Sequence, residues 1–323
     1  MSAPVARCLR FIKDWALPLT MLLGISAYFA FHALPVAPHW RILTRQTIGV
    51  VQPALIFCML FLSFCKINPK EVRPARWTWP HLALQAAGFV LPALAIVWLA
   101  PQDSPLIWLE CAMACLICPT ATAAAIITDR LGGDLKTVVA YTMAINLVAA
   151  LLISAFIPLI NPTAGLNFGQ AFGLIAAKVF PLLVLPFLLA WAVRLWCPGL
   201  LQYLLKIKDL AFYLWIVALA LAMAVTTRAL MHSHIGPGCL LGIAAVTLTT
   251  CLLQFGIGRL IGRKYHDTIS AGQALGQKNT VFIIWMAYTF LHPVTAVAGG
   301  FYSIWHNLIN SWHLHQKSET PSV

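Results

Sequence analysis

Long apolar runs separated by short polar segments dominate this chain of 323 residues. Each run has about the 20 residues that one helix needs to cross the hydrocarbon core of a bilayer. Basic residues fall between the runs and not along one polar face, so the pattern predicts membrane-spanning helices. The expected spans are 15–34, 47–65, 80–99, 105–128, 135–160, 170–194, 209–227, 236–260, 269–291 and 294–312.

The composition and the placement of charge agree with a membrane protein. Hydrophobic residues make up 61% of the chain and charged residues 9%, against about 25% charged in soluble domains. The net charge of +12 is explained by topology signals between spans, so we expect no nucleic-acid partner. With both termini in the cytoplasm, sixteen of the 21 lysines and arginines face that side, as the positive-inside rule requires. The exceptions are Arg41, Arg45 and Arg228 outside, and Lys178 and Lys278 within spans.

Two polar runs interrupt the apolar pattern at corresponding places in the two halves of the chain. One runs from Ser270 to Thr280 and contains Lys278, and the other runs from Cys118 to Ala123. Unwound backbone at bilayer depth is tolerated only inside protein or along a wet cavity, and paired broken helices indicate a transporter's binding site. Because each half has five spans, an odd number, the two halves have opposite orientations in the membrane. We therefore expect an all-α membrane protein with ten transmembrane helices in two inverted five-helix repeats, residues 1–160 and 161–323, with broken helices in spans 4 and 9.

Three short runs resemble motifs of the bile acid:sodium symporter family: Cys118–Ala123 with Gly133–Asp134 after it, Gly276–Asn279, and Ser303–Asn307. The resemblance extends over the whole ten-span layout. It implies a panel domain of spans 1, 2, 6 and 7 beside a core of spans 3–5 and 8–10. It also implies that the broken helices of spans 4 and 9 cross each other, that transport is coupled to sodium, and that the substrates are organic anions or steroid-like.

Most sodium ligands that the resemblance implies are missing. The family's Ser-Asn pair falls at Ala124 and Ala125, a hydroxyl at Val138, its glutamate at Ala274 and the next glutamine at Lys278, while a threonine is kept at Thr142. Hard cations prefer several oxygen ligands, and methyl groups supply none. We interpret the chain as a divergent bacterial-type member in which sodium coupling is altered or absent.

Lys278 lies about nine positions inside its span, at a Gly-rich break. In the functional interpretation its ammonium replaces a bound sodium ion and attracts an anionic substrate. In the alternative interpretation the side chain extends to the cytoplasmic interface. A buried lysine can also release its proton, so protons are the candidate coupling ion.

Other polar residues near the breaks are candidates for a substrate or ion site. They could bind an anion or orient Lys278, or they could only satisfy freed carbonyls and hydrogen-bond across helices. Glu110 could equally face outside water, and His306 could make only a structural hydrogen bond. The candidates besides Lys278 are Gln273, Gln277, Asn279, Thr280, Thr120, Thr122, Thr142, Asn146, His306, Asn307 and Glu110.

The function expected from this pattern is secondary active transport of a small organic anion or amphipathic acid by alternating access. The alternatives are a conventional sodium-dependent bile-acid-type symporter, and an intramembrane enzyme or channel. No phosphate loop, dinucleotide fingerprint or zinc-protease motif occurs in the sequence. We therefore expect no enzyme activity, no cofactor and no resident metal. We expect a multi-pass protein of a bacterial inner membrane, with lipid and the anion as partners.

Overall fold

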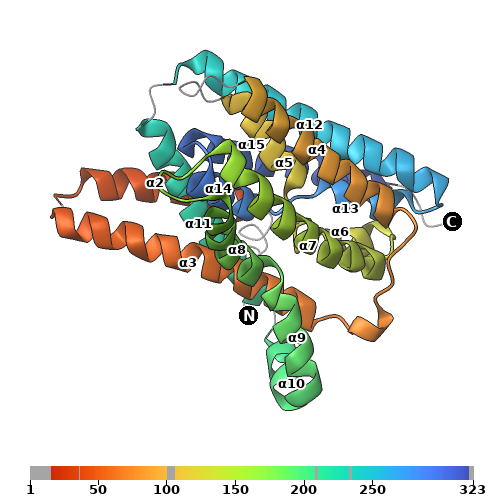
Figure 1. Cartoon of the computed structure of the whole chain (residues 1–323). Coiled ribbons are helices and arrows are strands. Elements are labelled where there is room, and N and C mark those ends of the chain that lie inside the picture. The colour runs from red at the N-terminus through yellow and green to blue at the C-terminus, as the bar shows by residue number, and fades with distance from the viewer. Residues whose placement is uncertain (1–15, 36, 100–105, 208–209, 233–234, 320–323) are drawn as a thin grey trace.

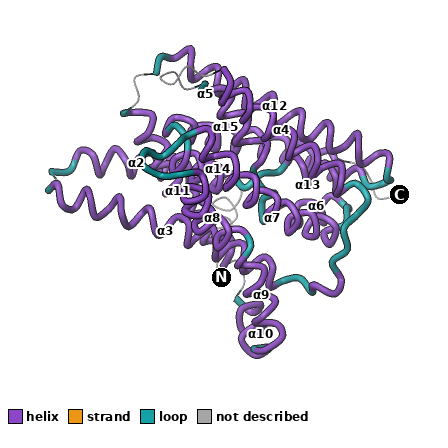
Figure 2. Tube along the Cα trace, viewed as in Figure 1, coloured by secondary structure: helices purple, strands orange, loops and turns teal. Residues whose placement is uncertain are grey.

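The computed structural model describes residues 16–35, 37–99, 106–207, 210–232 and 235–319. These ranges contain helices and no strand (Figure 1; Figure 2). In the first half the helices are α2 (Ala16–Ala33), α3 (Pro38–Cys65), η1 (Pro69–Glu71), α4 (Thr78–Leu99), α5 (Ile107–Ile117), α6 (Ala124–Leu131) and α7 (Leu135–Ile160). In the second half they are α8 (Phe168–Leu183), α9 (Leu185–Trp196), α10 (Pro198–Lys206), α11 (Leu210–Met231), α12 (Pro237–Lys264), α13 (Thr268–Gly276), α14 (Thr280–Phe290), η2 (Pro293–Ala296) and α15 (Val297–Glu319).

The all-α class is confirmed, and several helices are long and apolar enough to span a membrane. Among the described residues, five helices pass that test alone: α3, α4, α7, α11 and α12. The pair α8 and α9 passes together, although it bends by 43° between the two helices. Spans 4 and 9 are each two shorter helices, α5 with α6 and α13 with α14, as the breaks predict. The exact ten-helix inverted repeat stays a prediction.

The start of α3 and the presence of α10 differ from the expected spans. α3 begins at Pro38, well before the expected start at residue 47, because proline is favoured in the first helical turn. The early turns of α3 carry Arg41 and Arg45, so the helix continues beyond its apolar part. After α9, the short helix α10 was not expected. Four of the basic residues assigned to the cytoplasm, Arg7, Arg10, Lys13 and Lys208, lie outside the described residues.

The helices pack in two groups (Figure 1). α2 packs on α11, and α3 packs on both α9 and α11. α12 packs on α5, α13 and α15, while α4 packs on α5 and α7. α8 lies mainly on α7. This second group contains both broken helices and therefore positions the candidate site.

Apolar side chains cover much of the outer surface. Leu91, Trp98 and Leu241 are 66%, 85% and 72% exposed. Soluble monomers rarely expose such contiguous apolar area, whereas lipid accommodates it. The outer surface therefore fits a protein that is surrounded by lipid.

Four tryptophans near expected span ends are predicted to lie in interfacial belts. Trp79, Trp108 and Trp196 are exposed, in agreement with that prediction. Trp77 differs, because it is 1% exposed and its indole N–H donates to the Asp267 carboxylate at 2.8 Å. This tryptophan fixes the start of α4 to the residue before α13.

Candidate functional site

The two predicted breaks pair with each other through backbone hydrogen bonds. Thr120 and Lys278 form an antiparallel bridge. The Ala121 amide donates to the Gln277 carbonyl at 2.9 Å, and the Asn279 amide donates to the Pro119 carbonyl at 2.9 Å. Two interrupted helices that lie far apart in the sequence are thus joined at one point, which we call the crossing.

Local sequence explains why both helices stop at the crossing. Pro119 disfavours helical geometry at the preceding residue, and Cys118 accordingly has φ −52° and ψ 131°. In the second half, Gln277 is extended with φ −93° and ψ 109° after Gly276. Gly276 also has a packing role, because an added Cβ would lie 2.3 Å from the Phe255 ring. Close helix packing therefore coincides with the break.

A glutamine and a tyrosine satisfy the end of α5 in the first half. The Gln85 amide donates to the Leu116 carbonyl at 2.7 Å and to the Cys118 carbonyl at 3.2 Å. The Tyr141 hydroxyl donates to the carbonyl oxygen of the Gln85 side chain. Carbonyls that the break releases from helical bonding thereby gain donors, as buried polar groups require.

A second glutamine and tyrosine do the same for the end of α13. The Tyr302 hydroxyl donates to the Gly276 carbonyl at 2.7 Å. The Gln254 amide donates to the Tyr302 hydroxyl at 3.0 Å and to the Cys115 carbonyl at 3.4 Å. Gln85 and Gln254 lie in expected spans 3 and 8, and the tyrosines lie in spans 5 and 10. The roles within the two pairs differ, because Gln85 donates to the carbonyls at the end of α5, whereas Tyr302 donates to the carbonyl at the end of α13.

Further side chains of the crossing are also engaged with backbone. The Thr120 hydroxyl donates to the Ala274 carbonyl at 2.7 Å, which links the two breaks again. The Cys118 thiol donates to the Asn279 carbonyl at 3.1 Å. The Asn279 side chain accepts from the Phe282 amide at 3.2 Å and so caps α14. For Thr120 and Asn279, the structure therefore shows the backbone-satisfying role.

Lys278 is different because nothing satisfies its side chain. It is 0% exposed, and among the described residues its ammonium nitrogen has no hydrogen-bond partner. An isolated buried ammonium is costly. The site therefore contains one buried amino group that the described residues leave without a hydrogen-bond partner.

Two neighbouring amides and two threonines complete the surroundings of the break. Gln273 and Gln277 are each 2% exposed, and their side-chain oxygens have no partner among the described residues. Thr280 is buried at the first position of α14. Thr122 is half-buried between α5 and α6. These residues lie in or next to the segments that the structure brings together.

The positions that replace sodium ligands are closed and apolar. Ala124, Val138 and Ala274 are all 0% exposed, and Ala125 is 8% exposed. The Thr142 hydroxyl donates to the Val138 carbonyl at 2.8 Å, within its own helix. These five positions therefore offer a hard cation no free oxygen ligand, since the Thr142 hydroxyl is engaged within its own helix.

The remaining candidates serve contacts away from the bridge. The Asn146 amide donates to the Leu183 carbonyl at 3.1 Å, where α8 bends into α9. Asn307 donates to the Ser303 carbonyl at 2.7 Å. His306 is buried, with its ring edge-on to Tyr302 at 5.7 Å. Glu110 is 6% exposed and accepts from the Thr295 hydroxyl at 2.7 Å and the His292 amide at 3.2 Å, so it fixes α5 to η2.

Sequence reasoning missed the residues that hold the crossing together. Gln85 and Gln254 are single amides inside apolar spans, and that signal could have identified them, because intramembrane amides usually hydrogen-bond across helices. Tyr141 and Tyr302 carry no comparable signal, since a tyrosine in an apolar run is ordinary.

Among the described residues no group of three or more His, Cys, Asp or Glu side chains could hold a metal ion.

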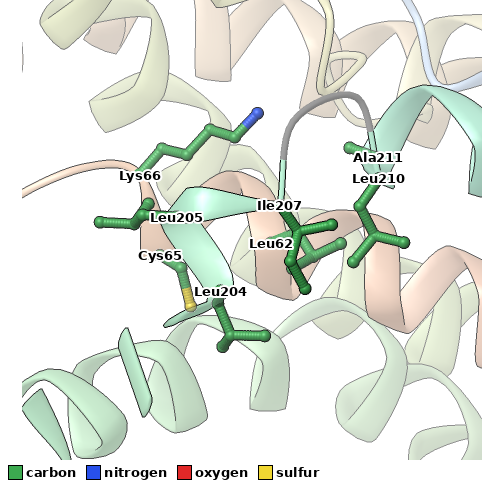
Figure 3. Close-up of a pocket in the computed structure, with 8 residues that line it drawn as sticks. All are labelled: Leu62, Cys65, Lys66, Leu204, Leu205, Ile207, Leu210 and Ala211. Atoms are coloured by element: carbon green, nitrogen blue, oxygen red, sulfur yellow. The ribbon is translucent and has the colours of Figure 1, made fainter. Parts of the chain in front are cut away.

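The small crevice in Figure 3 lies between the end of α3, α10 and the start of α11. Leucines, Ile207, Ala211, Cys65 and Lys66 line it. Its volume of about 10 Å³ leaves room for about one water molecule. This crevice is therefore too small for an organic substrate.

Comparison with known proteins agrees with the architecture around the crossing. No curated protein matches the chain. The model of the SBF-like CPA transporter family matches residues 18–302, which is most of the sequence and includes both breaks. Together with the apolar helices, this match identifies an integral, multi-pass membrane protein of a transporter family. The chain belongs to the SBF-like CPA transporter family.

Proposed function

We propose that this protein is a secondary active transporter that carries a small organic anion by alternating access, with Lys278 in place of a sodium ion. The observation that carries the proposal is the fully buried, unpartnered ammonium at the point where the two broken helices pair. The first turns of α6 and α14 begin beside it, and helix N-termini favour negative charge. A fixed cation with two such helix ends suits a carboxylate.

The charge of Lys278 and the alanines at the expected ligand positions both disfavour sodium binding at the crossing. An ammonium and a sodium ion at adjacent positions would repel strongly in a low-dielectric interior. The carbonyls that a break would offer to a cation already accept from Gln85, Tyr302 and Thr120. We therefore propose coupling that is independent of sodium, with the proton as the candidate coupling ion.

The proposed topology has ten spans in two inverted repeats, with both termini in the cytoplasm of a bacterial cell. The pairing of the two breaks, one in each half, supports the repeat, because paired broken helices at corresponding places are typical of inverted-repeat transporters. Accessibility of introduced cysteines tests this directly. Residues 66–76 and the end of α12 at residues 259–264 should be labelled from the same side, and labelling from opposite sides would contradict the topology.

Transport in proteoliposomes tests the mechanism. The purified protein should exchange radiolabelled organic anions across the vesicle in saturable counterflow, which a channel or an enzyme does not show. Uptake should respond to an imposed proton gradient and not to a sodium gradient. A strict sodium requirement would contradict the proposal. Lys278→Gln should impair transport without creating sodium dependence, because Ala124, Ala125 and Ala274 still provide no oxygens.

A combined variant provides the converse test. Adding Ala124→Ser, Ala125→Asn and Ala274→Glu to Lys278→Gln supplies the oxygen ligands that the family resemblance implies. A ligand that binds only the folded state raises the melting temperature. The combined variant should melt higher in sodium chloride than in potassium chloride, and the unmodified protein should not. Selective stabilisation of the unmodified protein by sodium would show that the ion binds elsewhere.

A further inference from the structure

A second set of polar side chains lies away from the crossing. These side chains line a cavity that includes the end of α14, whose first residue lies beside the crossing. The cavity has a volume of about 250 Å³ and lies between the end of α7, the first part of α8 and the end of α14. Five of its ten lining residues are aliphatic, and Leu174 and Ile175 are among them. The polar lining residues are Asn161, Thr163, Lys178 and Thr289.

Lys178 lies against an aromatic wall in this cavity. Its ammonium nitrogen is 5.9 Å from the centroid of the Phe290 ring. The Phe290 ring packs edge-on against Trp285 at 5.5 Å, and the Asn161 amide donates to the Phe290 carbonyl at 3.2 Å. The wall is therefore held in place from two sides before any ligand arrives.

The charge of Lys178 is available to a ligand. Among the described residues no carboxylate forms an ion pair with it, and its side chain is exposed. A cation over an aromatic face gains some stabilisation from the ring, but an ammonium has three donors. A carboxylate would accept charge-assisted hydrogen bonds from these donors.

The size and lining of the cavity limit the ligand. Drug-sized ligands occupy pockets of about 300–1,000 Å³, so 250 Å³ suits a smaller molecule than a steroid. The aliphatic and aromatic walls favour an apolar body, and Lys178 favours one negative charge. These features together describe a small monocarboxylate with an aromatic or branched body.

We propose that this cavity binds small amphipathic monocarboxylates, with the carboxylate on Lys178 and the apolar body along Phe290 and Leu174. The inference rests on the proposed function. It names the class of substrate and gives that substrate a binding site on its path to the crossing. In the proposed topology the ends of α7 and α14 lie on the outer side. The cavity is then where the anion first binds before it reaches Lys278.

Calorimetric titration of the solubilised full-length protein tests the site with three probes of one shape: benzoate, benzamide and benzylamine. Benzoate should bind at least tenfold more tightly than the other two, because only it carries negative charge. Lys178→Gln should weaken benzoate binding about tenfold or more and leave benzamide unchanged. Lys66→Gln, which changes an exposed lysine in another part of the molecule, should bind benzoate as the unmodified protein does. Equal binding by Lys178→Gln and the unmodified protein, or no benzoate binding to the unmodified protein, would overturn the inference.

A second variant separates this inference from the proposed function. Lys278→Met leaves the cavity wall unchanged, so it should bind benzoate with unchanged affinity while counterflow is lost. If Lys278→Met still carries out counterflow, the proposed role of Lys278 fails and the cavity stands. If Lys278→Met loses benzoate binding as strongly as Lys178→Gln does, the cavity is not a separate site and the inference fails.

Discussion

Replacing Lys278 by methionine should make the protein more stable and unable to transport. The ammonium is 0% exposed and has no hydrogen-bond partner among the described residues. Methionine has a similar length and is apolar. Replacing buried ionic groups by apolar ones of similar volume often stabilises proteins by about 1–4 kcal/mol. For a chain of this size, this corresponds to a rise in melting temperature of roughly 2–8 °C.

The assay compares thermal melts and counterflow for the unmodified protein, Lys278→Met and a control. Lys70→Met is the matched control, because Lys70 is exposed in η1 and lies away from the crossing. The control should change neither melting temperature nor transport. A gain in stability with loss of activity is the behaviour of a residue kept for function.

A fall in the melting temperature of Lys278→Met would refute this reasoning. It would mean that the ammonium makes a favourable contact that stabilises the folded state. Unchanged transport would refute the functional part separately, since no anion would then depend on the charge. The melting temperature therefore tests the cost of burying the ammonium, and counterflow independently tests its role in transport.

Three further outcomes follow from other parts of the structure. Gly24→Ala should destabilise the protein by about 1–3 kcal/mol, because an added Cβ would lie 2.3 Å from a carbonyl of α11. At Gly49 an added Cβ meets open space, so Gly49→Ala should stabilise the helix by up to about 1 kcal/mol. Equal melting temperatures for the two variants would contradict this packing. Thr120→Val should lower stability by about 1–3 kcal/mol in chemical denaturation because it leaves a buried carbonyl of α13 without its donor, and an unchanged denaturation midpoint would show that the contact is unimportant. The hydrogen bond from Lys136 lowers the pKa of Glu71 from its ordinary 4.5, so this contact stabilises the protein above that pH and is lost as pH falls through the lowered value. The melting temperatures of Glu71→Gln and the unmodified protein should therefore differ at pH 7 and converge in acid, and a difference that persists at low pH would contradict the assignment.

The breaks and the position of Lys278 could be predicted from the sequence because proline, glycine and a lysine in apolar runs carry strong local signals. The family resemblance implied that the two broken helices cross, and the bridge between Thr120 and Lys278 agrees with that prediction. The donors that satisfy the breaks could not be predicted, because which helix faces a freed carbonyl depends on packing. Trp77 was misplaced for the same reason, since an interfacial tryptophan and one bonded to Asp267 have the same local sequence.

The bridge also has a consequence for the order in which this protein can be made. The Thr120 hydroxyl and its acceptor, the Ala274 carbonyl, are 154 positions apart, so the first half is synthesised and inserted long before its partner exists. Until α13 and α14 arrive, the end of α5 lacks part of its hydrogen bonding in a bilayer that supplies no water. The inserted first half therefore remains incompletely hydrogen-bonded during synthesis. Assembly is finished only when the last three expected spans enter the membrane. A fragment ending at residue 160 should accordingly be degraded when expressed alone and recovered when residues 161–323 are expressed with it.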